Sequence, residues 1–417
     1  MSLRPHAVQP FDIYHRMALR VVQASMRFRI GFAGRLDEDA LREALRLSAS
    51  SIPVIASAWR PNAWKARWRP RPELAGDLLR VVDAPDCYRA AAIAAFEAPI
   101  DVENGPQGFA TLVRGPKGDS LCFVLNHMVG DAVGLRWWVR EVGRLYTALV
   151  RGEEARPSPF QPRGPGPVLR RMGLKRRLRL FFSVPDSKGQ AKSLGLAHED
   201  GPCRTLFRSI SPDDLARVRA AAKGLGATVN DVLVAAVARA DHAFNGSEQL
   251  DLPYTVDLRR VAGSPGMRPL AHLSSFATAH VDRLGQATMA DTVRQVAAGA
   301  AGVRQGDEVW RGQDAWPVGT FWLPYALLEK MYGQTMKAPP LLVTNCGALP
   351  EEDFTFGEPA QAVVTAGGFK TSPHIQVNAV TYAGRLTLTV GIQGDDHAHA
   401  AVQAFLDDVA RQIVSLR

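Results

Sequence analysis

A proline- and glycine-rich segment near the middle of the chain separates two long stretches in which strand and helix patterns mix. The segment opens with RGEEARPSPFQPRGPGP, and the change in composition runs from about Gly152 to Gly201. Such composition is typical of a connection between units and not of a regular element. We therefore expect an α/β (α+β) protein with two domains, residues 1–160 and 201–417, joined by a linker at residues 161–200.

Helix signals are strongest at four places in the sequence. LDEDALREALRLSAS reads as an amphipathic helix, with Asp37 as its N-cap and Leu36 placed to pack on Leu41. SPDDLARVRAAAKGLGA and TVNDVLVAAVARADHAF predict two helices in the second half, and HAHAAVQAFLDDVARQIV predicts a closing helix. Strand patterns such as SMRFRIGFAG and RLTLTVGIQG occur in both halves.

The positive charge of the chain is local. Fifty Lys and Arg against 41 Asp and Glu give a net charge of +9. Residues 163–192 hold nine basic residues and one acid, so this segment carries 9 − 1 = +8 and leaves about +1 for the rest. A nucleic-acid-binding protein presents a broad basic field, so we exclude nucleic acid as a partner. The aromatic and basic stretch WRPNAWKARWRP is then better explained by packing of amphipathic side chains.

The chain has the features of a cytoplasmic protein. It contains no run of about 18 uninterrupted apolar residues, which a membrane span would need. Its first residues lack the apolar core of a signal peptide. The four cysteines, Cys87, Cys122, Cys203 and Cys346, are far apart and form no CxxC pair, which favours reduced thiols.

The common catalytic and metal-binding motifs are absent from the sequence. It has no GxSxG, GxxxxGK, HExxH or strand-linked GxGxxG pattern. DDHAHA resembles a metal cluster, but Asp395 or Asp396 as the cap of the closing helix explains it more simply. We therefore predict no metal site.

One apolar strand pattern ends abruptly at a histidine, in SLCFVLNHMVGDAVG. The end of a strand places His127 at the rim of a sheet, where its imidazole can take a proton from an attacking hydroxyl or amine. Asp131 follows four positions later and can anchor the loop, and Gly130 and Gly134 allow a sharp turn. The HxxxD spacing alone also fits a structural histidine.

The segments around this motif carry a family resemblance. NHMVGDA resembles the HHxxxDG signature of the superfamily of condensation domains and chloramphenicol-acetyltransferase-like acyltransferases, which includes wax-ester-synthase-type enzymes. TVNDVLVAAVARA resembles their Asn-Asp helix, and VDLRR and VTNCGAL resemble two of their strands. The order agrees over most of the chain. Asn126 replaces the first histidine and Ala132 the closing glycine, whereas His127 keeps the position of the second histidine.

The resemblance implies two acetyltransferase-like sandwich domains that form a pseudo-dimer with a central tunnel. It implies no permanently bound cofactor. The substrate would be an acyl thioester, on coenzyme A or on the phosphopantetheine of an acyl-carrier protein, and a small-molecule or lipid acceptor would meet it at the histidine. His127 would be the general base and Asp131 a structural residue. Because a buried carboxylate needs an opposite charge, Arg259 is one candidate partner for Asp131. Candidates for oxyanion or tunnel contacts are Asn126, Gly130, Thr344 and Asn345.

Two further segments keep alternative interpretations. The basic linker suits the phosphates of coenzyme A, an acidic carrier protein, or peripheral contact with an anionic membrane, but also a solvated crossover. VGTFWLPYALLEKMY suits a tunnel wall, although an ordinary core helix is favoured.

Three functions follow from these observations. The leading hypothesis is a stand-alone acyltransferase that makes an ester or an amide without a covalent acyl-enzyme. The second is a condensation-type enzyme of peptide or polyketide assembly, and the third is an inactive relative that serves as a scaffold.

Overall fold

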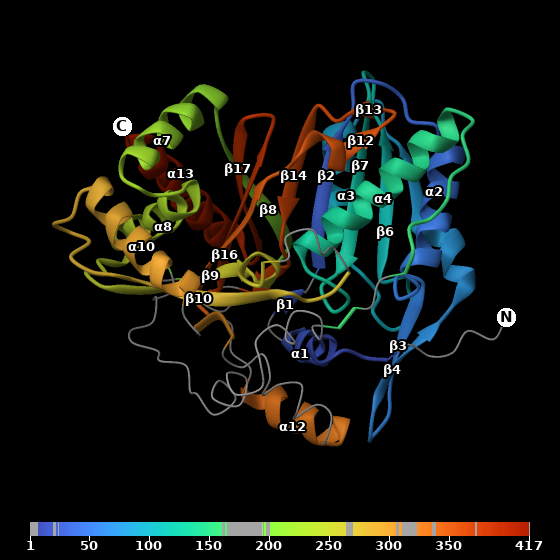
Figure 1. Ribbon diagram of the computed structural model, residues 1–417, viewed down its shortest axis with the longest axis horizontal. Coiled ribbons are helices and arrows are strands. Elements are labelled where there is room, and N and C mark those ends of the chain that lie inside the picture. Colours follow the sequence, from blue (N-terminus) through green and yellow to red (C-terminus); the bar gives the residue numbers. More distant parts are fainter. Residues whose placement is uncertain are drawn as a thin grey trace.

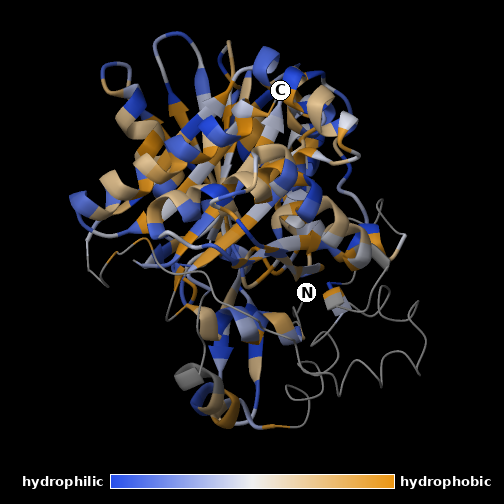
Figure 2. Cartoon of the chain, turned by 90° about the vertical axis from the view of Figure 1, so that its left-hand side faces the viewer, coloured by the Kyte–Doolittle hydropathy of each residue, from blue (hydrophilic) through white to orange (hydrophobic). Residues whose placement is uncertain are grey.

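The computed structural model describes residues 7–19, 22–23, 25–160, 163–164, 194, 196, 201–263, 270–305, 308–310, 323–335, 339–371 and 373–416. Figure 1 shows two lobes side by side, each built from a sheet with helices packed on it. Apolar residues gather on the strands and on the helix faces turned toward them (Figure 2). The two-lobed α/β architecture predicted from the sequence is confirmed. Nearly all of the predicted linker lies outside the described residues.

The first lobe is a five-stranded sheet in the order β14-β2-β7-β6-β5. All neighbouring strands are antiparallel except β5 and β6. Side chains of β7 alternate between two faces, so that Phe123 packs in the core formed with helices α2 and α4 while Cys122 packs with α3. Its elements are β2 (Ser25–Gly31), α2 (Glu38–Ser51), η1 (Pro72–Leu78), β5 (Leu79–Asp83), α3 (Tyr88–Glu97), β6 (Gly108–Arg114), β7 (Asp119–Asn126), α4 (Ala132–Val150) and β14 (Ala362–Ala366).

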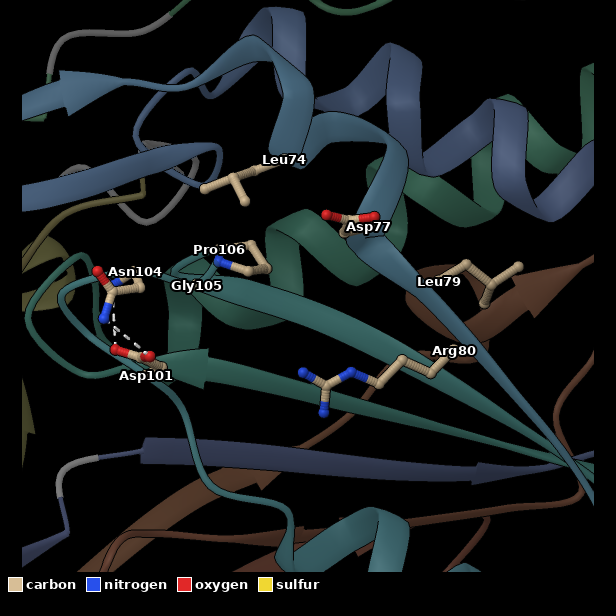
Figure 3. Close-up of a pocket in the computed structure, with 8 residues that line it drawn as sticks. All are labelled: Leu74, Asp77, Leu79, Arg80, Asp101, Asn104, Gly105 and Pro106. Carbon is tan, nitrogen blue, oxygen red and sulfur yellow. Dashed lines mark hydrogen bonds between the residues drawn. The ribbon is translucent and has the colours of Figure 1, made fainter.

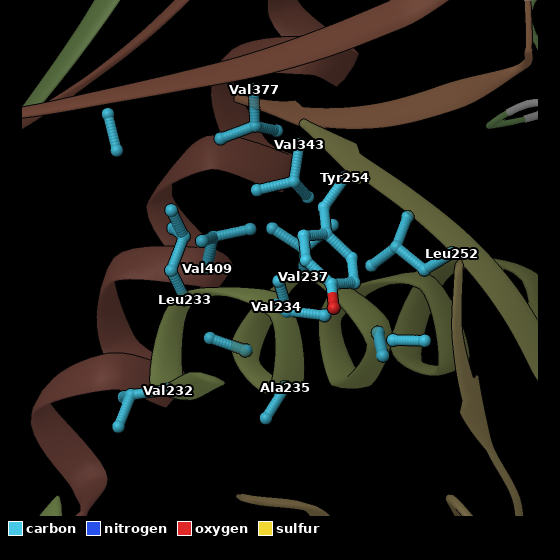
Figure 4. Packing of buried hydrophobic residues seen from close by; sticks show 14 of the residues in the cluster. Val232, Leu233, Val234, Ala235, Val237, Leu252, Tyr254, Val343, Val377 and Val409 are labelled. Atoms are coloured by element: carbon cyan, nitrogen blue, oxygen red, sulfur yellow. The ribbon is translucent and has the colours of Figure 1, made fainter. Parts of the chain in front are cut away.

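The second lobe is an eight-stranded sheet, β1-β15-β17-β16-β11-β9-β10, with β8 paired to β17. Helix α8 is its central helix, and Figure 4 shows Leu233 and Val237 packed against Tyr254, Val343 and Val377 of the strands. Its elements are β1 (Val22–Gln23), β8 (Cys203–Ile210), α7 (Pro212–Gly224), α8 (Val229–Asn245), β9 (Leu250–Asp257), α9 (Leu258–Val261), β10 (Ser274–Val281), α10 (Met289–Gln305), η3 (Glu308–Trp310), β11 (Leu341–Ala348), β15 (Phe369–Thr371), β16 (Ile375–Tyr382), β17 (Arg385–Gln393) and α13 (Asp396–Ser415).

The two lobes exchange strands. Val22 of β1, from the first half of the sequence, pairs with Lys370 in the sheet of the second lobe. In the other direction, Val363 of β14 pairs with Ile30 of β2 and forms the edge of the first sheet. These strands cross the predicted division into 1–160 and 201–417, so neither range contains all strands of the large sheet of its lobe.

The remaining elements join or cover the lobes. Helix α1 (Pro10–Ala18) lies below the junction of the two lobes in Figure 1, and the β3–β4 hairpin (Ser57–Pro61 and Ala66–Pro70) projects beside it. Helix α12 (Tyr325–Thr335) is attached to this hairpin, because the Tyr325 N–H donates to the Trp64 carbonyl oxygen. The short elements η4 (Glu351–Phe354) and β12 (Thr355–Phe356) pack over α4, and β13 (Glu358–Pro359) pairs with β12.

Several local predictions are confirmed. The Asp37 carboxylate accepts from the Ala40 N–H at 2.9 Å, and Asp395 accepts from Ala398 at 2.7 Å, so both residues are helix N-caps. In WRPNAWKARWRP, Trp59 and Trp68 are fully buried and contact each other edge to face, as expected from packing, whereas Trp64 is 73% exposed and does not fit that prediction.

The apolar segment VGTFWLPYALLEKMY is only partly a core helix. Helix α12 begins at Tyr325, which is buried together with Leu328, while Leu327 and Met331 are exposed. Residues 318–322 of this segment lie outside the described part of the chain.

Among the described residues, no single helix is long and apolar enough to cross a bilayer. Helices α7 and α8 reach that length and composition only together, and a 99° bend separates them.

Candidate active site at the junction of the lobes

His127 lies where β7 ends and the chain turns toward α4. Strand β7 is buried from Asp119 to Asn126, and His127 is the first residue of the loop and is partly accessible. The loop meets the second lobe, because the Asp131 N–H donates to the Ala271 carbonyl oxygen at 3.2 Å. The histidine predicted from the sequence therefore lies at the junction of the lobes.

The orientation of the His127 ring defines which nitrogen is free. Its Nδ1 lies 3.0 Å from the Gly130 carbonyl oxygen. A carbonyl oxygen can only accept, so Nδ1 carries the proton in the neutral imidazole. Nε2 is then the unprotonated nitrogen, with its lone pair available to a substrate. The loop itself thus sets the tautomer that a general base requires.

Asp131 anchors this loop to α4 and to the second lobe. Its carboxylate caps α4 by accepting from the Gly134 N–H at 2.9 Å, and it also accepts from the Leu273 N–H at 2.8 Å. Arg259 of α9 binds both carboxylate oxygens, at 2.8 and 3.1 Å. The Asp131–Arg259 pair predicted from the sequence is present, and it connects the first lobe to the second.

The pair is buried, and the charges compensate each other. Burial alone would raise the pKa of Asp131, but the Arg259 guanidinium and the Leu273 N–H hold it below the ordinary value. Burial acts to lower the pKa of Arg259, and the carboxylates of Asp131 and Asp257 raise it above its ordinary value. Both residues are therefore charged at neutral pH and act as a fixed ion pair.

Asn126 forms hydrogen bonds that position the histidine loop. Its side-chain amide donates to Gln107 Oε1 at 2.7 Å, and its side-chain oxygen accepts from the Met128 N–H at 3.0 Å. The residue is only 1% exposed. Asn126 therefore holds the loop from the protein interior, and we withdraw it from the oxyanion and tunnel candidates.

The other departure from the signature is structurally small. Ala132 is the first residue of α4 and does not have a positive φ, so glycine is not required there. Gly130 is the residue that needs to be small, because a Cβ atom at this position would lie 2.8 Å from Leu270 Cδ1. Its carbonyl oxygen already orients His127.

Thr344 and Asn345 lie on β11 beside other polar residues. Gln376 Nε2 donates to Thr344 Oγ1 at 3.1 Å, and Asn345 Nδ2 donates to Asn230 Oδ1 at 3.3 Å. The TVND and VTNC segments thus meet in space, although they are 115 residues apart. No hydrogen bond within the described ranges joins either residue to His127, and their role as oxyanion donors stays a prediction.

Two further histidines, which no sequence pattern predicted, lie beside His127. The His15 ring from α1 stacks on His127 with centroids 4.2 Å apart and an interplanar angle of 14°. His15 also stacks on His272, at 4.2 Å and 21°. His272 precedes β10 and is buried. No local pattern marks either residue, because the cluster forms only when three distant segments meet.

Burial makes these imidazoles neutral. It lowers the pKa of His127 below the ordinary value, against the opposing effects of its backbone hydrogen bond and the Asp131 carboxylate. It lowers the pKa of His272 to about 3, helped by the nearby His127, and that of His15 well below 6.5. Lys370 of β15 also acts on His15 and His127, and burial lowers its own pKa to about 8.

A second buried ion pair supports the histidine loop. Arg163 binds the Asp12 carboxylate at 2.7 Å and donates to the carbonyl oxygens of Val129 and Leu270. From its position in the sequence, Arg163 was expected to belong to the local basic patch of residues 163–192; this is wrong for Arg163, since its side chain is 8% exposed. The error arises because its partner Asp12 lies 151 positions away.

A pocket of about 480 Å³ lies elsewhere, on the first lobe (Figure 3). It is lined by residues of η1, β5 and the segment 101–106, and none of the three histidines borders it. Its Asp101 is occupied by hydrogen bonds with Asn104. The pocket is therefore separate from the candidate active site.

No family model matches the sequence, and no curated protein matches it. Solved structures do. The first condensation domain of the CDA synthetase is similar over 100% of this chain and 97% of its own, with a TM-score of 0.73 and 15% identity. The starter condensation domain of rhizomide synthetase RzmA, in complex with C8-CoA and Leu-SNAC, has a TM-score of 0.68 and 14% identity over 98% and 94% of the chains.

An acetyltransferase has the same architecture. The TRI3 trichothecene 15-O-acetyltransferase from Fusarium sporotrichioides is similar over 99% of this chain and 95% of its own, with a TM-score of 0.69 and 14% identity. Similarity at such low identity establishes the fold. The chain therefore has the same two-lobed fold as these condensation domains and this acetyltransferase.

Proposed function

We propose that the protein is an acyltransferase that moves an acyl group from a thioester to a hydroxyl or amine acceptor, with His127 as the general base. The observation that carries this proposal is the hydrogen bond from His127 Nδ1 to the Gly130 carbonyl oxygen, which leaves Nε2 free at the junction of the lobes. The lowered pKa of His127 keeps that nitrogen unprotonated at neutral pH.

The reaction needs no covalent acyl-enzyme. His127 Nε2 takes the proton of the acceptor, whose oxygen or nitrogen attacks the thioester carbonyl carbon. The carbon–sulfur bond then breaks, and the proton passes from His127 to the leaving thiolate, which departs as a free thiol. Burial raises the pKa of Cys346 to about 11 and that of Cys122 to about 12, so these thiols stay protonated and are poor nucleophiles.

The oxyanion that develops on the carbonyl oxygen requires hydrogen-bond donors. We propose the Gly130 N–H and the side chains of Thr344 and Asn345. Gly130 is next to the base and packs closely against Leu270 of the other lobe, so its position is well defined. Thr344 and Asn345 are partly accessible, as donors to a substrate must be.

The donor is proposed to be acyl-coenzyme A or an acyl-carrier protein. The structurally similar starter condensation domain of rhizomide synthetase RzmA was solved with C8-CoA, which supports a coenzyme A thioester as the donor. The acceptor is a small molecule or a lipid with a hydroxyl or amine. A condensation-type reaction between two carrier-bound substrates is the second candidate, favoured by the similarity to the CDA synthetase domain.

The test is a turnover assay with purified full-length protein. A panel of acyl-coenzyme A and acyl-carrier thioesters is incubated with mixed alcohols and amines, and free thiol and product mass are followed. His127→Ala should reduce turnover about 10²–10⁴-fold, the usual contribution of a general base. The matched control is His280→Ala. His280 is an exposed histidine of β10 that pairs with Asp251 of β9, and its removal should leave turnover unchanged.

Three outcomes discriminate between the hypotheses. Equal turnover by His127→Ala would exclude the histidine as the base. Turnover with carrier-bound donors alone would select the condensation-type reaction. No turnover with any donor would favour an inactive relative.

A further inference from the structure

The three stacked histidines come from three separate parts of the chain. His15 lies on α1, His127 follows β7, and His272 precedes β10. One ring nitrogen of each residue lies within 4.8 Å of the corresponding nitrogens of the other two. We propose that these histidines form a binding site for a divalent metal ion of the zinc class.

The type of donor suits such an ion. Imidazole nitrogen is a preferred ligand of zinc, copper, nickel and cobalt, whereas magnesium and calcium prefer oxygen. His127 also has the outer contact that metal-binding histidines usually make, because its Nδ1 donates to a backbone carbonyl oxygen, that of Gly130. Its Nε2 is therefore the nitrogen that binds the ion.

His272 supplies an independent observation. Its side chain is 6% exposed, and among the described residues its ring has one hydrogen-bonding contact, with the Met128 backbone, which falls short of normal geometry. A buried polar group without a partner costs about 1–3 kcal/mol. Aromatic stacking leaves this cost in place, whereas a bond from one ring nitrogen to a metal ion removes part of it.

Binding requires one ring to move. Zinc–nitrogen bonds of about 2.0–2.1 Å in a tetrahedral site bring the nitrogens to about 3.4 Å from one another. The rings are also within 21° of parallel, whereas a metal is bound in the plane of each ring. The His127 ring is held by its hydrogen bond to Gly130. The two residues beside His272 are held by hydrogen bonds of their backbone to Asp131, so His15 on α1 is the ring that turns.

The charge near the site gives a second test. Lys370 acts electrostatically on His15 and His127, so it opposes a cation bound between them. Replacing Lys370 with methionine should therefore tighten metal binding.

One consequence rests on the proposed function. His127 Nε2 cannot bind a metal ion and accept a proton at the same time. Metal binding and acyl transfer should thus exclude each other, and zinc should inhibit turnover at the concentration at which it binds.

The experiment measures metal binding by the full chain without reference to turnover. Metal-free protein is titrated with Zn²⁺ by calorimetry and with Co²⁺ by visible absorption, which reports the ligand geometry. We expect one ion per chain. His15→Gln and His272→Gln should each weaken binding at least tenfold, since loss of even an outer-shell partner typically costs 10–100-fold. His280→Gln, which alters an exposed histidine, is the matched control and should leave binding unchanged.

The results separate this proposal from the proposed function. Absence of saturable binding, or unchanged binding by both His15→Gln and His272→Gln, would overturn the metal site even if His127→Ala lost turnover. Conversely, a metal site that depends on all three histidines would stand even if His127→Ala kept full turnover. Unfolding curves of each variant establish that lost binding does not reflect lost structure.

Discussion

The ion pair between Asp131 and Arg259 should be the most sensitive single contact of the candidate site. Both side chains are almost fully buried, with 4% and 1% exposed, and they are joined at 2.8 Å. Arg259→Met keeps the length and apolar stem of the side chain but removes the charge. It leaves the Asp131 carboxylate buried, and within the described part of the chain the N–H groups of Gly134 and Leu273 are the donors that remain.

The expected cost follows from that geometry. Removing one partner of a buried ion pair typically costs about 3–5 kcal/mol, because the remaining charge is uncompensated. This is a large part of the 5–15 kcal/mol by which a typical domain is stable. The double variant Asp131→Asn with Arg259→Met removes both charges and keeps an oxygen for the α4 cap, so it should recover part of the loss.

Urea unfolding followed by circular dichroism measures these free energies, and Arg294→Met is the matched control. Arg294 and Asp291 are also 2.8 Å apart, but their side chains are 57% and 49% exposed. That pair should contribute less than about 1 kcal/mol. If Arg259→Met costs no more than Arg294→Met, the argument from burial is refuted.

Three further outcomes are expected. His272 has a pKa of about 3 in the folded protein and about 6.5 in the unfolded chain, so on acidification the unfolded chain takes up the proton at a higher pH. From this residue alone, the free energy of unfolding should fall by about 2 kcal/mol between pH 7 and pH 5, as measured by urea titrations. The value of kcat/KM should fall on acidification with a midpoint below the ordinary histidine pKa of about 6.5, since burial lowers the pKa of His127; a midpoint above 6.5 in the pH–rate profile would contradict this. Gly143→Ala should destabilise the protein, since its Cβ would lie 2.4 Å from the Thr355 carbonyl oxygen. By contrast, the Cβ of Gly299→Ala in α10 would meet no atom within 4 Å, so this variant should stabilise the protein by about 0.5–1 kcal/mol in thermal or urea unfolding.

Local patterns predicted the parts of the site that are close in sequence. The strand that ends at His127, the turn after it and the cap at Asp131 all lie within one short segment, where residue spacing determines geometry. The Arg259 pair was also predictable, because a buried carboxylate needs a partner and the resemblance to known proteins offered one.

Contacts between distant segments were not predictable in this way. His15 and His272 reach His127 only through the packing of α1 and the α9–β10 segment, and no spacing rule connects them. Arg163 looked like one more cation in a basic segment until its partner Asp12 was known. The strand exchange was missed for the same reason, since β1 and β14 are short and pair with strands more than 300 positions away.

The position of β14 has a consequence for synthesis of the chain. Strand β2 emerges from the ribosome early, but its edge partner, residues 362–366, follows more than 300 residues later. At about 5–20 residues per second, the interval is at least about 15 seconds. During that time the N-terminal sheet has an open β2 edge of unpaired N–H and carbonyl groups, which is a template for pairing with another nascent chain. This edge can be closed only after residues 362–366 have been synthesised and have paired with β2.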